Sequence, residues 1–384
     1  MKKLLHVMFL FIFFNQVFAT KPGLSGYVTE MPSVFWLNQP QSTLWWQNLV
    51  HNRLDFTWQI DKNFSFNAGL RNRFIAGSSA LIDFKSMNFD KGIMDLTFNT
   101  IASTNGSVSS VLNHTFDRLN VVFEKNKWQF ILGRQRINWG QTLVWNPNDI
   151  FNTYSFFDFD YPERPGCDAF RGTYFHTPTS STELAVSVNH YNKVTAAAMH
   201  RWNVKNFDFQ ILGGMLETSD VLVGGAVTTD IKGLNIRGEF SIFHPFKNFA
   251  DTITTAAVSV GFDYMFSNSL MLQTEILYNN VSSSNINNGL ISLYSAPLSA
   301  KNLSVCNWNW FAQVSYPITP LLNGSLSAMY FIDMKGFYTG FSLDYSLAEN
   351  LDLSAIAQYF FMKEPLLPSN VNMLLGFIRL KYSF

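Results

Sequence analysis

The feature that most limits how this chain can fold is a repeated alternation of apolar and polar residues. In AVSVGFDYMF (257–266), Val, Val, Phe, Tyr and Phe occupy every second position and oppose Ser, Gly and Asp. The segments LNIRGEFSIF (234–243), FYTGFSLDYS (337–346) and LDLSAIAQYF (351–360) repeat the pattern. A period of two is typical of β-strands with one apolar and one polar face.

The composition indicates which solvent the apolar faces meet. Aromatic residues make up 16% of the 384 residues and charged residues only 14%, which suits contact with lipid better than with water. No window after residue 20 holds about 18 consecutive apolar residues, as a spanning helix requires. A closed barrel is the other structure that satisfies its backbone in lipid. We therefore expect an all-β, transmembrane antiparallel β-barrel of 16–20 strands, with 18 the preferred count.

The connections between these segments differ in length. Short turns such as Asp61-Lys62-Asn63 and Ala348-Glu349-Asn350 alternate with longer links such as 138–168 and 280–303. Short turns at one end and long loops at the other are typical of outer-membrane barrels. The path of residues 76–115 is not settled: if 61–63 and 124–127 are short turns at the same end of the barrel, the strands assigned between them do not have the number that this requires.

The two ends of the chain carry targeting signals. Residues 1–19 read as a secretory signal peptide, with Lys2 and Lys3 before a short apolar run that ends in Val-Phe-Ala. Residues 20–46 are expected to hold a first strand and a Trp-rich loop or plug, and 47–384 the barrel. Tyr382 and Phe384 end an alternating segment that resembles the closing strand of Gram-negative outer-membrane proteins. That resemblance implies recognition by the outer-membrane assembly machinery.

Two arginines in GRQRINWGQ (133–141) conflict with the alternation. Continued from Trp128 and Leu132, the lipid face would carry Arg134 and Arg136, at a cost of about 2–4 kcal/mol each near the bilayer centre. Glycine within a strand often marks a bulge that shifts the face by one residue. We therefore expect Gly133 to turn both arginines into the lumen.

The connection that follows is rich in acids and aromatic residues and is expected to fold inward at about 138–168. Because it is too apolar for disorder, the inner wall of the barrel is its nearest support. The residues expected to line a constriction or to anchor this loop are Arg134, Arg136, Asp149, Asp158, Asp160, Glu163, Arg164 and Arg171. Asp149, Asp158 and Asp160 are the leading partners for the two arginines. A charged rim that contacts solutes is the alternative role, with Trp139, Trp145 and Tyr154 as further solute contacts.

Four short motifs in 128–176 are shared with known proteins: Gly133-Arg134-Gln135, Trp139-Gly140, Asn146-Pro147-Asn148-Asp149 and Glu163-Arg164-Pro165-Gly166. They resemble a poorly characterised family of Gram-negative, porin-like outer-membrane barrels. The resemblance implies the fold, a location in the outer membrane of a Gram-negative bacterium and a channel role. It supplies no ligand residues.

Other kinds of chemistry find little support in the sequence. Lys and Arg number 27, as do Asp and Glu, so no basic field indicates nucleic acid. The histidines and neighbouring serines lack a catalytic spacing, so we expect no enzyme. The acids of 158–163 lack the spacing of a calcium loop, and we expect no metal or cofactor. Cys167 and Cys306 lie in different loops of an oxidising compartment, where a disulfide between them is one possibility.

These observations favour a channel for passive or facilitated diffusion of small hydrophilic solutes. The expected inward positions carry mainly Asn, Ser, Thr and Gln with both signs of charge, which indicates uncharged or mixed solutes. The alternative is a plugged barrel that serves an export or envelope-assembly complex. Expected partners are outer-membrane lipid, the assembly machinery, small solutes, and either further copies of the chain or an envelope complex.

Overall fold

A computed structural model describes residues 21–38, 42–78, 92–104, 107–157, 159–247, 249–280, 299–304, 306–363 and 370–384. The expected signal peptide and Asp158 lie outside these residues. No helix in the described ranges is long and apolar enough to cross a membrane.

The described residues form nineteen β-strands in one antiparallel sheet. Their bounds are β1 Gly23–Leu37, β2 Thr43–Gln59, β3 Phe64–Gly77, β4 Thr97–Thr104, β5 Ser107–Lys125, β6 Trp128–Gln135, β7 Cys167–Thr177, β8 Ser180–Val188, β9 Val194–Val204, β10 Phe207–Leu216, β11 Asp220–Ile231, β12 Leu234–Pro245, β13 Thr255–Met265, β14 Met271–Asn279, β15 Trp308–Thr319, β16 Leu322–Phe331, β17 Gly336–Ala348, β18 Leu351–Met362 and β19 Val371–Ser383.

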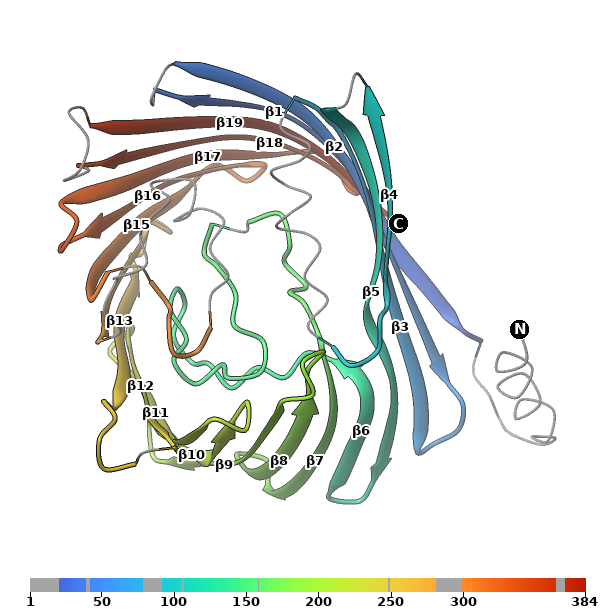
Figure 1. Ribbon diagram of the computed structural model, residues 1–384, viewed down its shortest axis with the longest axis vertical. Helices are drawn as coiled ribbons and strands as arrows, with labels where there is room; N and C mark the ends of the chain where they lie inside the picture. Colours follow the sequence, from blue (N-terminus) through green and yellow to red (C-terminus); the bar gives the residue numbers. More distant parts are fainter. Residues whose placement is uncertain are drawn as a thin grey trace.

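Eighteen of the nineteen strands close into a ring, because β1 pairs with both β2 and β19 (Figure 1). The exception is β4. Strand β3 pairs directly with β5, and β4 pairs with the opposite edge of β5, beyond the end of β6. The predicted barrel class and strand number are thus confirmed. The extra strand explains why the turns between residues 64 and 123 did not alternate as expected.

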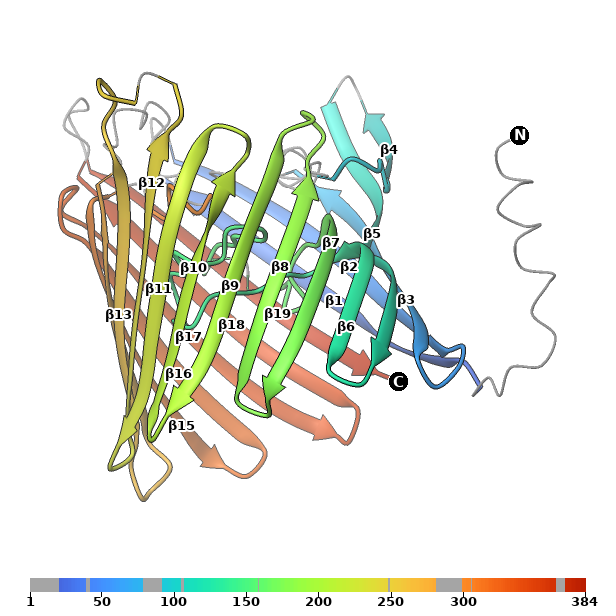
Figure 2. The same cartoon turned by 90° about the horizontal axis from the view of Figure 1, so that it is seen from below.

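The two rims of the barrel differ, as Figure 2 shows in side view. One rim carries short turns, such as those between β5 and β6 and between β11 and β12. The other carries the long connections between β6 and β7 and between β14 and β15. At the N-terminal end, residues 23–37 and 43–46 lie in strands, so the expected first strand is present and the three tryptophans of this segment belong to β1 and β2. β1 and β2 pair from Gly23–Thr57 to Leu37–Thr43 and belong to the wall.

The wall sorts side chains by face. Outward positions carry exposed aromatic and aliphatic side chains, among them Leu132, Ile211, Trp308 and Tyr382. Inward positions carry buried polar side chains such as Gln47, Glu239 and Ser259. Closure is completed by the last residue, since the backbone N and O of Phe384 both bond to Gly26 at 2.9 Å.

Candidate functional site: the inward loop and its charged wall

The connection between β6 and β7, residues 136–166, folds into the interior of the barrel (Figure 1, green). This confirms the predicted inward loop. We call this segment the inward loop. The described loop residues form no strand or helix, and side chains of the wall supply many of the contacts that hold the loop.

The first anchor is the carboxylate of Glu239 on β12, which is buried beneath the loop. One oxygen, Oε2, accepts hydrogen bonds from the backbone N of Gln141 at 2.6 Å and of Thr142 at 3.2 Å. The other, Oε1, accepts one from the backbone N of Asn148. A turn that exposes several amides to one side is a binding place for an anion, and here the wall supplies that anion.

Glu275 on β14 binds the loop residues between Thr142 and Asn148 in the same way. Its carboxylate accepts hydrogen bonds from the backbone N of Leu143, Val144 and Trp145 at 3.1, 3.0 and 2.8 Å. Ser259 on β13 donates its hydroxyl to the same group at 2.8 Å. Two buried wall carboxylates therefore hold the loop from residue 141 to residue 148.

The two loop tryptophans are part of this attachment. The indole N of Trp139 donates to Glu183 on β8 at 2.6 Å, and its side chain is 1% exposed. Trp145 is also buried, and its ring meets that of Phe311 edge to face at 6.4 Å. The expectation that these two side chains contact solutes is thus corrected: neither ring reaches the lumen.

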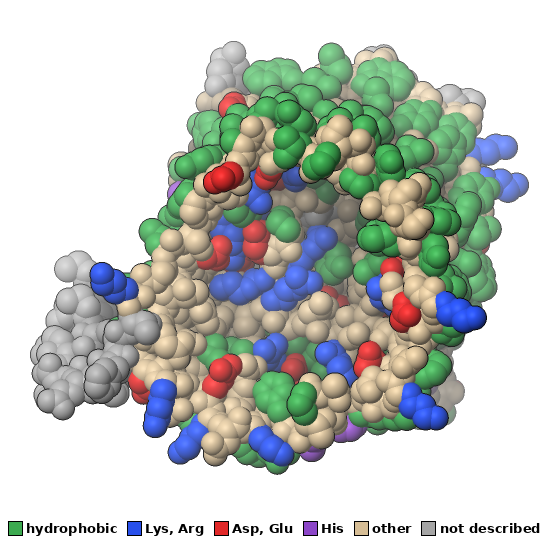
Figure 3. Space-filling view, turned by 180° about the vertical axis from the view of Figure 1, so that it is seen from behind, with side chains coloured by type: hydrophobic (Ala, Val, Ile, Leu, Met, Phe, Trp, Pro, Cys, Tyr) green, Lys and Arg blue, Asp and Glu red, His purple; other side chains and the backbone are tan. Residues whose placement is uncertain are grey.

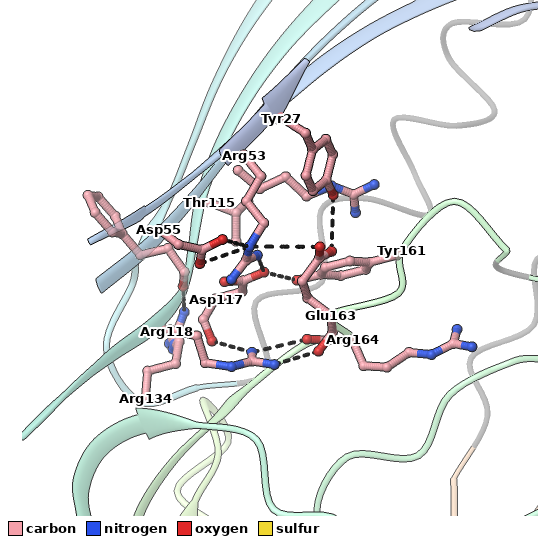
Figure 4. A network of polar contacts seen from close by, with 12 residues as sticks. Tyr27, Arg53, Asp55, Thr115, Asp117, Arg118, Arg134, Tyr161, Glu163 and Arg164 are labelled. Carbon is pink, nitrogen blue, oxygen red and sulfur yellow. Dashed lines mark hydrogen bonds and ion pairs between the residues drawn. The ribbon is translucent and has the colours of Figure 1, made fainter. Parts of the chain in front are cut away.

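A network of arginines holds the other end of the loop (Figure 4). Arg118 on β5 donates to the backbone carbonyls of Glu163 and Arg164. Arg53 on β2 is paired with Asp117, and Asp117 accepts the hydroxyl of Tyr161 from the loop at 2.6 Å.

Two predicted acids join this network through other partners. Asp160 pairs with Arg71 on β3 at 3.4 Å, and the Arg71 guanidinium lies 4.0 Å from the centre of the Tyr161 ring. Glu163 accepts the hydroxyl of Tyr27 on β1 at 3.1 Å. Asp160 therefore pairs with an arginine of β3 and Glu163 contacts a tyrosine of β1, whereas the prediction had Arg134 and Arg136 as the partners of Asp160.

Aromatic side chains fill the space between these two polar anchors. Phe157 packs edge to face on Tyr338 and Phe360, with ring centres 5.1 Å apart in each case. Phe159 packs in the same way on Phe377 at 5.0 Å. The apolar part of the loop is thus buried against β17, β18 and β19, as expected for a loop too aromatic to remain in water.

Arg134 is buried, but its partner and setting differ from the prediction. Gly133 has φ of 115°, a conformation that L-residues rarely adopt, and the register with β5 continues without an inserted residue. The guanidinium pairs with Asp168, its cross-strand neighbour on β7, at 2.7 and 2.9 Å. It also donates to the backbone carbonyl of Met94 at 2.7 Å. The pair therefore joins β6, β7 and the segment before β4.

Arg136 has no ion pair with any carboxylate in the described part of the chain. Its guanidinium lies 5.9 Å from the Tyr154 ring, and that of Arg164 lies 3.8 Å from the same ring. Asp149 lies fully buried nearby, where burial raises its pKa to about 7, an increase that the charge of Arg136 opposes. Burial likewise raises the pKa of Tyr154.

Three wall arginines and the first residue of the inward loop bind only neutral groups among the described residues: Arg118, Arg171 and Arg201 in the wall, and Arg136 in the loop. Arg171 donates to Gln129 at 3.4 Å and Arg201 to Gln210 at 3.0 Å. All four side chains are partly exposed. The acids Glu183, Glu239 and Glu275, in contrast, are buried beneath the loop. Basic and acidic side chains are both visible in the hollow of the barrel (Figure 3).

The hypothesis of a disulfide does not agree with the structure. Cys167 and Cys306 are free thiols, each buried in a different apolar cluster. Cys167 begins β7 beside Asn152, whereas Cys306 lies before β15. Elsewhere in the described ranges, His, Cys, Asp and Glu side chains form no group of three or more that could hold a metal ion.

Sequence reasoning missed the strongest loop contacts. The alternation in 234–243 predicts that Glu239 points inward, which is correct. The sequence does not predict that Glu239 accepts hydrogen bonds from backbone amides of the loop such as that of Asn148, because every residue except proline has a backbone N–H and its contacts do not depend on the side-chain pattern. Arg53, Arg71 and Arg118 were missed for a related reason: each stands in a strand whose residues were assigned to the wall without a role.

A closed antiparallel barrel of eighteen strands with a loop folded into its interior is the architecture of outer-membrane porins. OccAB4 from Acinetobacter baumannii superposes with a TM-score of 0.57 over 96% of this chain and 100% of its own, at 10% identity. The outer membrane protein OpdK from Pseudomonas aeruginosa gives a TM-score of 0.57 over 94% of this chain and 99% of its own, at 8% identity. A structure of OpdK with vanillate gives 0.56, over 94% and 98%, at 9% identity. No protein-family model and no curated protein matches the chain. At these identities the likeness establishes the fold.

Proposed function

We propose that the protein is a channel in the outer membrane of a Gram-negative bacterium and admits small hydrophilic solutes by diffusion. The observation that carries this proposal is the closed ring of eighteen strands, apolar and aromatic outside, whose hollow interior is lined by polar and charged groups. Barrels of this size enclose water.

We further propose that the channel prefers anions. Glu183, Glu239 and Glu275 are withdrawn beneath the inward loop, so they contribute little to the field in the water-filled space. The partly exposed guanidinium groups of Arg118, Arg136, Arg171 and Arg201 remain without a described carboxylate partner. Guanidinium groups match carboxylates and phosphates in geometry. Vanillate, the compound in one OpdK structure, is a carboxylate, which agrees with this proposal.

Planar bilayers test both statements. The purified barrel should give stepwise ohmic currents, and a potassium chloride gradient should give a zero-current potential of the sign expected for chloride preference. Arg171→Gln combined with Arg201→Gln should move that potential toward cation preference. Lys62→Gln is the matched control, because Lys62 is exposed in the turn between β2 and β3. A silent barrel would favour the plugged alternative, and an unmoved potential would remove the anion proposal alone.

A further inference from the structure

The outer face of β1, β2, β3 and β5 departs from the apolar surface of the rest of the barrel. Asn52, Asn72 and His114 are cross-strand neighbours in one row. Their chain neighbours His51, Arg71 and Asn113 are buried on the inner side, which places this row on the outside. We call the row the polar row.

The polar row is linked by its own hydrogen bonds. Asn72 Nδ2 donates to Asn52 Oδ1 at 2.8 Å, and His114 Nδ1 lies 2.5 Å from Asn72 Oδ1. Glu30 on β1 is outward as well, since Thr29 and Met31 on either side are buried, and it accepts Asn48 Nδ2 at 3.1 Å. Among the described residues, no partner is seen for Asn52 Nδ2 or for His114 Nε2.

The polar row lies near the middle of the barrel along its axis, where outward side chains would face the hydrocarbon of the membrane. On β2 the outward tryptophans Trp46 and Trp58 lie twelve positions apart, and Asn52 is six positions from each. At about 3.3 Å per residue and a tilt of about 40°, those tryptophans are roughly 30 Å apart along the barrel axis. That distance matches the hydrocarbon band, so Asn52 lies near its centre. The flanking outward residues Val28 and Phe74 are apolar and exposed.

An unpaired amide or imidazole at this depth costs several kcal/mol when it faces acyl chains. Outward polar side chains elsewhere in the described wall, such as His176, Thr182 and His200, stand near the short-turn rim. The centre of the band is therefore polar on this side of the barrel, and a protein surface satisfies such groups better than lipid does.

We propose that this face binds a second copy of the chain around a two-fold axis parallel to the barrel axis, between β2 and β3. The face is self-complementary. It carries an acid, Glu30, at its β1 edge and a base, His114, at its β5 edge, with amides between them. A two-fold operation places the acid of each copy beside the base of the other and brings Asn52 near Asn72 of the second copy.

The heights agree with this operation. Phe64, at the turn of β3, pairs with Phe123, which lies two residues before the end of β5, so cross-strand rows rise toward β5. At about 3 Å per strand, His114 lies about 9 Å above Val28, and Glu30 lies about 5 Å above Val28. The two groups therefore differ by only about 4 Å in height. One proton between them makes a hydrogen bond, whichever group holds it.

The size of the face is also sufficient. Four strands at about 4.8 Å spacing across a band about 25 Å tall present roughly 500 Å² per copy. Two copies together bury about 1,000 Å², the area at which specific interfaces begin.

Cysteine cross-linking between differently tagged chains tests the proposal. One chain carries Asn52→Cys and the other Asn72→Cys, both with Cys167→Ala and Cys306→Ala, so that a bond between the two tags can only join two copies. We expect a disulfide-linked heterodimer in native membranes. The control pair Val260→Cys and Ile276→Cys, on the exposed outer face of β13 and β14, should give none.

A second set of variants tests the acid–base contact. Glu30→Gln should weaken dimerisation about tenfold, as expected for a side-chain hydrogen bond inside a membrane. Glu30→His combined with His114→Glu should restore it, because the two-fold axis still places an acid on a base. Absence of the cross-link together with a monomeric mass in nanodiscs would overturn the proposal, as would a cross-link to a different protein. Conductance is read separately, so this outcome is independent of the channel function.

Discussion

Replacing Glu239 by glutamine measures how firmly a wall carboxylate holds the inward loop. The carboxylate spreads its bonds over two oxygens: Oε2 serves Gln141 and Thr142, and Oε1 serves Asn148. A glutamine has one acceptor oxygen, so its NH₂ group must meet at least one backbone N–H. At least one charge-assisted bond is lost, at about 1.5–3 kcal/mol.

Removal of a buried charge offsets part of this loss. We therefore expect a net change of about 2 kcal/mol, which shifts the equilibrium between attached and released loop by about thirtyfold. Chymotrypsin cleavage after Leu143 or Trp145 reports the released form, because both sites lie between Thr142 and Asn148, the residues that Glu239 holds. When opening is fast, the cleavage rate follows the released population.

The control is Glu217→Gln, the same chemical change at an exposed residue whose ion pair with Lys193 is 3.9 Å long. Exposed pairs contribute little, so cleavage should change less than about twofold. Current noise in bilayers should rise with Glu239→Gln and not with the control. If both variants are cleaved at the rate of the unaltered protein, the carboxylate does not hold the loop and the reasoning from its contacts fails.

Three further changes test other parts of the structure. Asp168→Asn removes a buried carboxylate that pairs with the guanidinium of Arg134, so we expect a loss of about 3–5 kcal/mol in the free energy of unfolding, measured by urea titration; an unchanged midpoint would contradict this. Burial raises the pKa of Asp149 from 3.8 to about 7, so the folded loop holds a proton that the released loop gives up between these values. Loop attachment should therefore be strongest below about pH 4 and weaken as pH rises through 7, and Asp149→Asn should reduce this dependence when chymotrypsin cleavage is normalised at each pH to that of a small substrate. Deletion of Phe384 removes both backbone bonds to Gly26, and the share of heat-modifiable, folded barrel should fall while synthesis continues; an equal share would show that closure does not need this residue.

The fold could be predicted from the sequence because each strand alternates apolar residues, which face lipid, with polar residues, which face the interior. The alternation in a segment such as 257–266 predicts these two faces without information about any other strand. The extra strand β4 was not predictable in this way. It has the composition of a strand, and only its pairing, beyond the end of β6, removes it from the ring.

The site was predictable in location but not in its pairings. The sequence placed a loop rich in acids and aromatic residues inside the barrel, and Asp160 and Glu163 do hold it there. The partner of Arg134 was misassigned because the alternation along a strand predicts only which face a side chain takes. Its partner depends on which residue of the neighbouring strand lies opposite. Asp168 stands directly across from Arg134 in the β6–β7 pair, nearer than any acid of the loop.

The ring is closed by the pairing of β1 with β19, which joins residues as far apart in the sequence as Tyr27 and Ser383. Every other neighbouring pair in the wall can form as soon as its two strands exist, and both lie close in the sequence, but this pair must wait until β19 has been made. A chain that stops early, at any point before β19, therefore presents two unpaired sheet edges instead of a finished wall. A factor that binds unpaired strand edges can therefore distinguish an open barrel from a closed one without recognising any particular sequence.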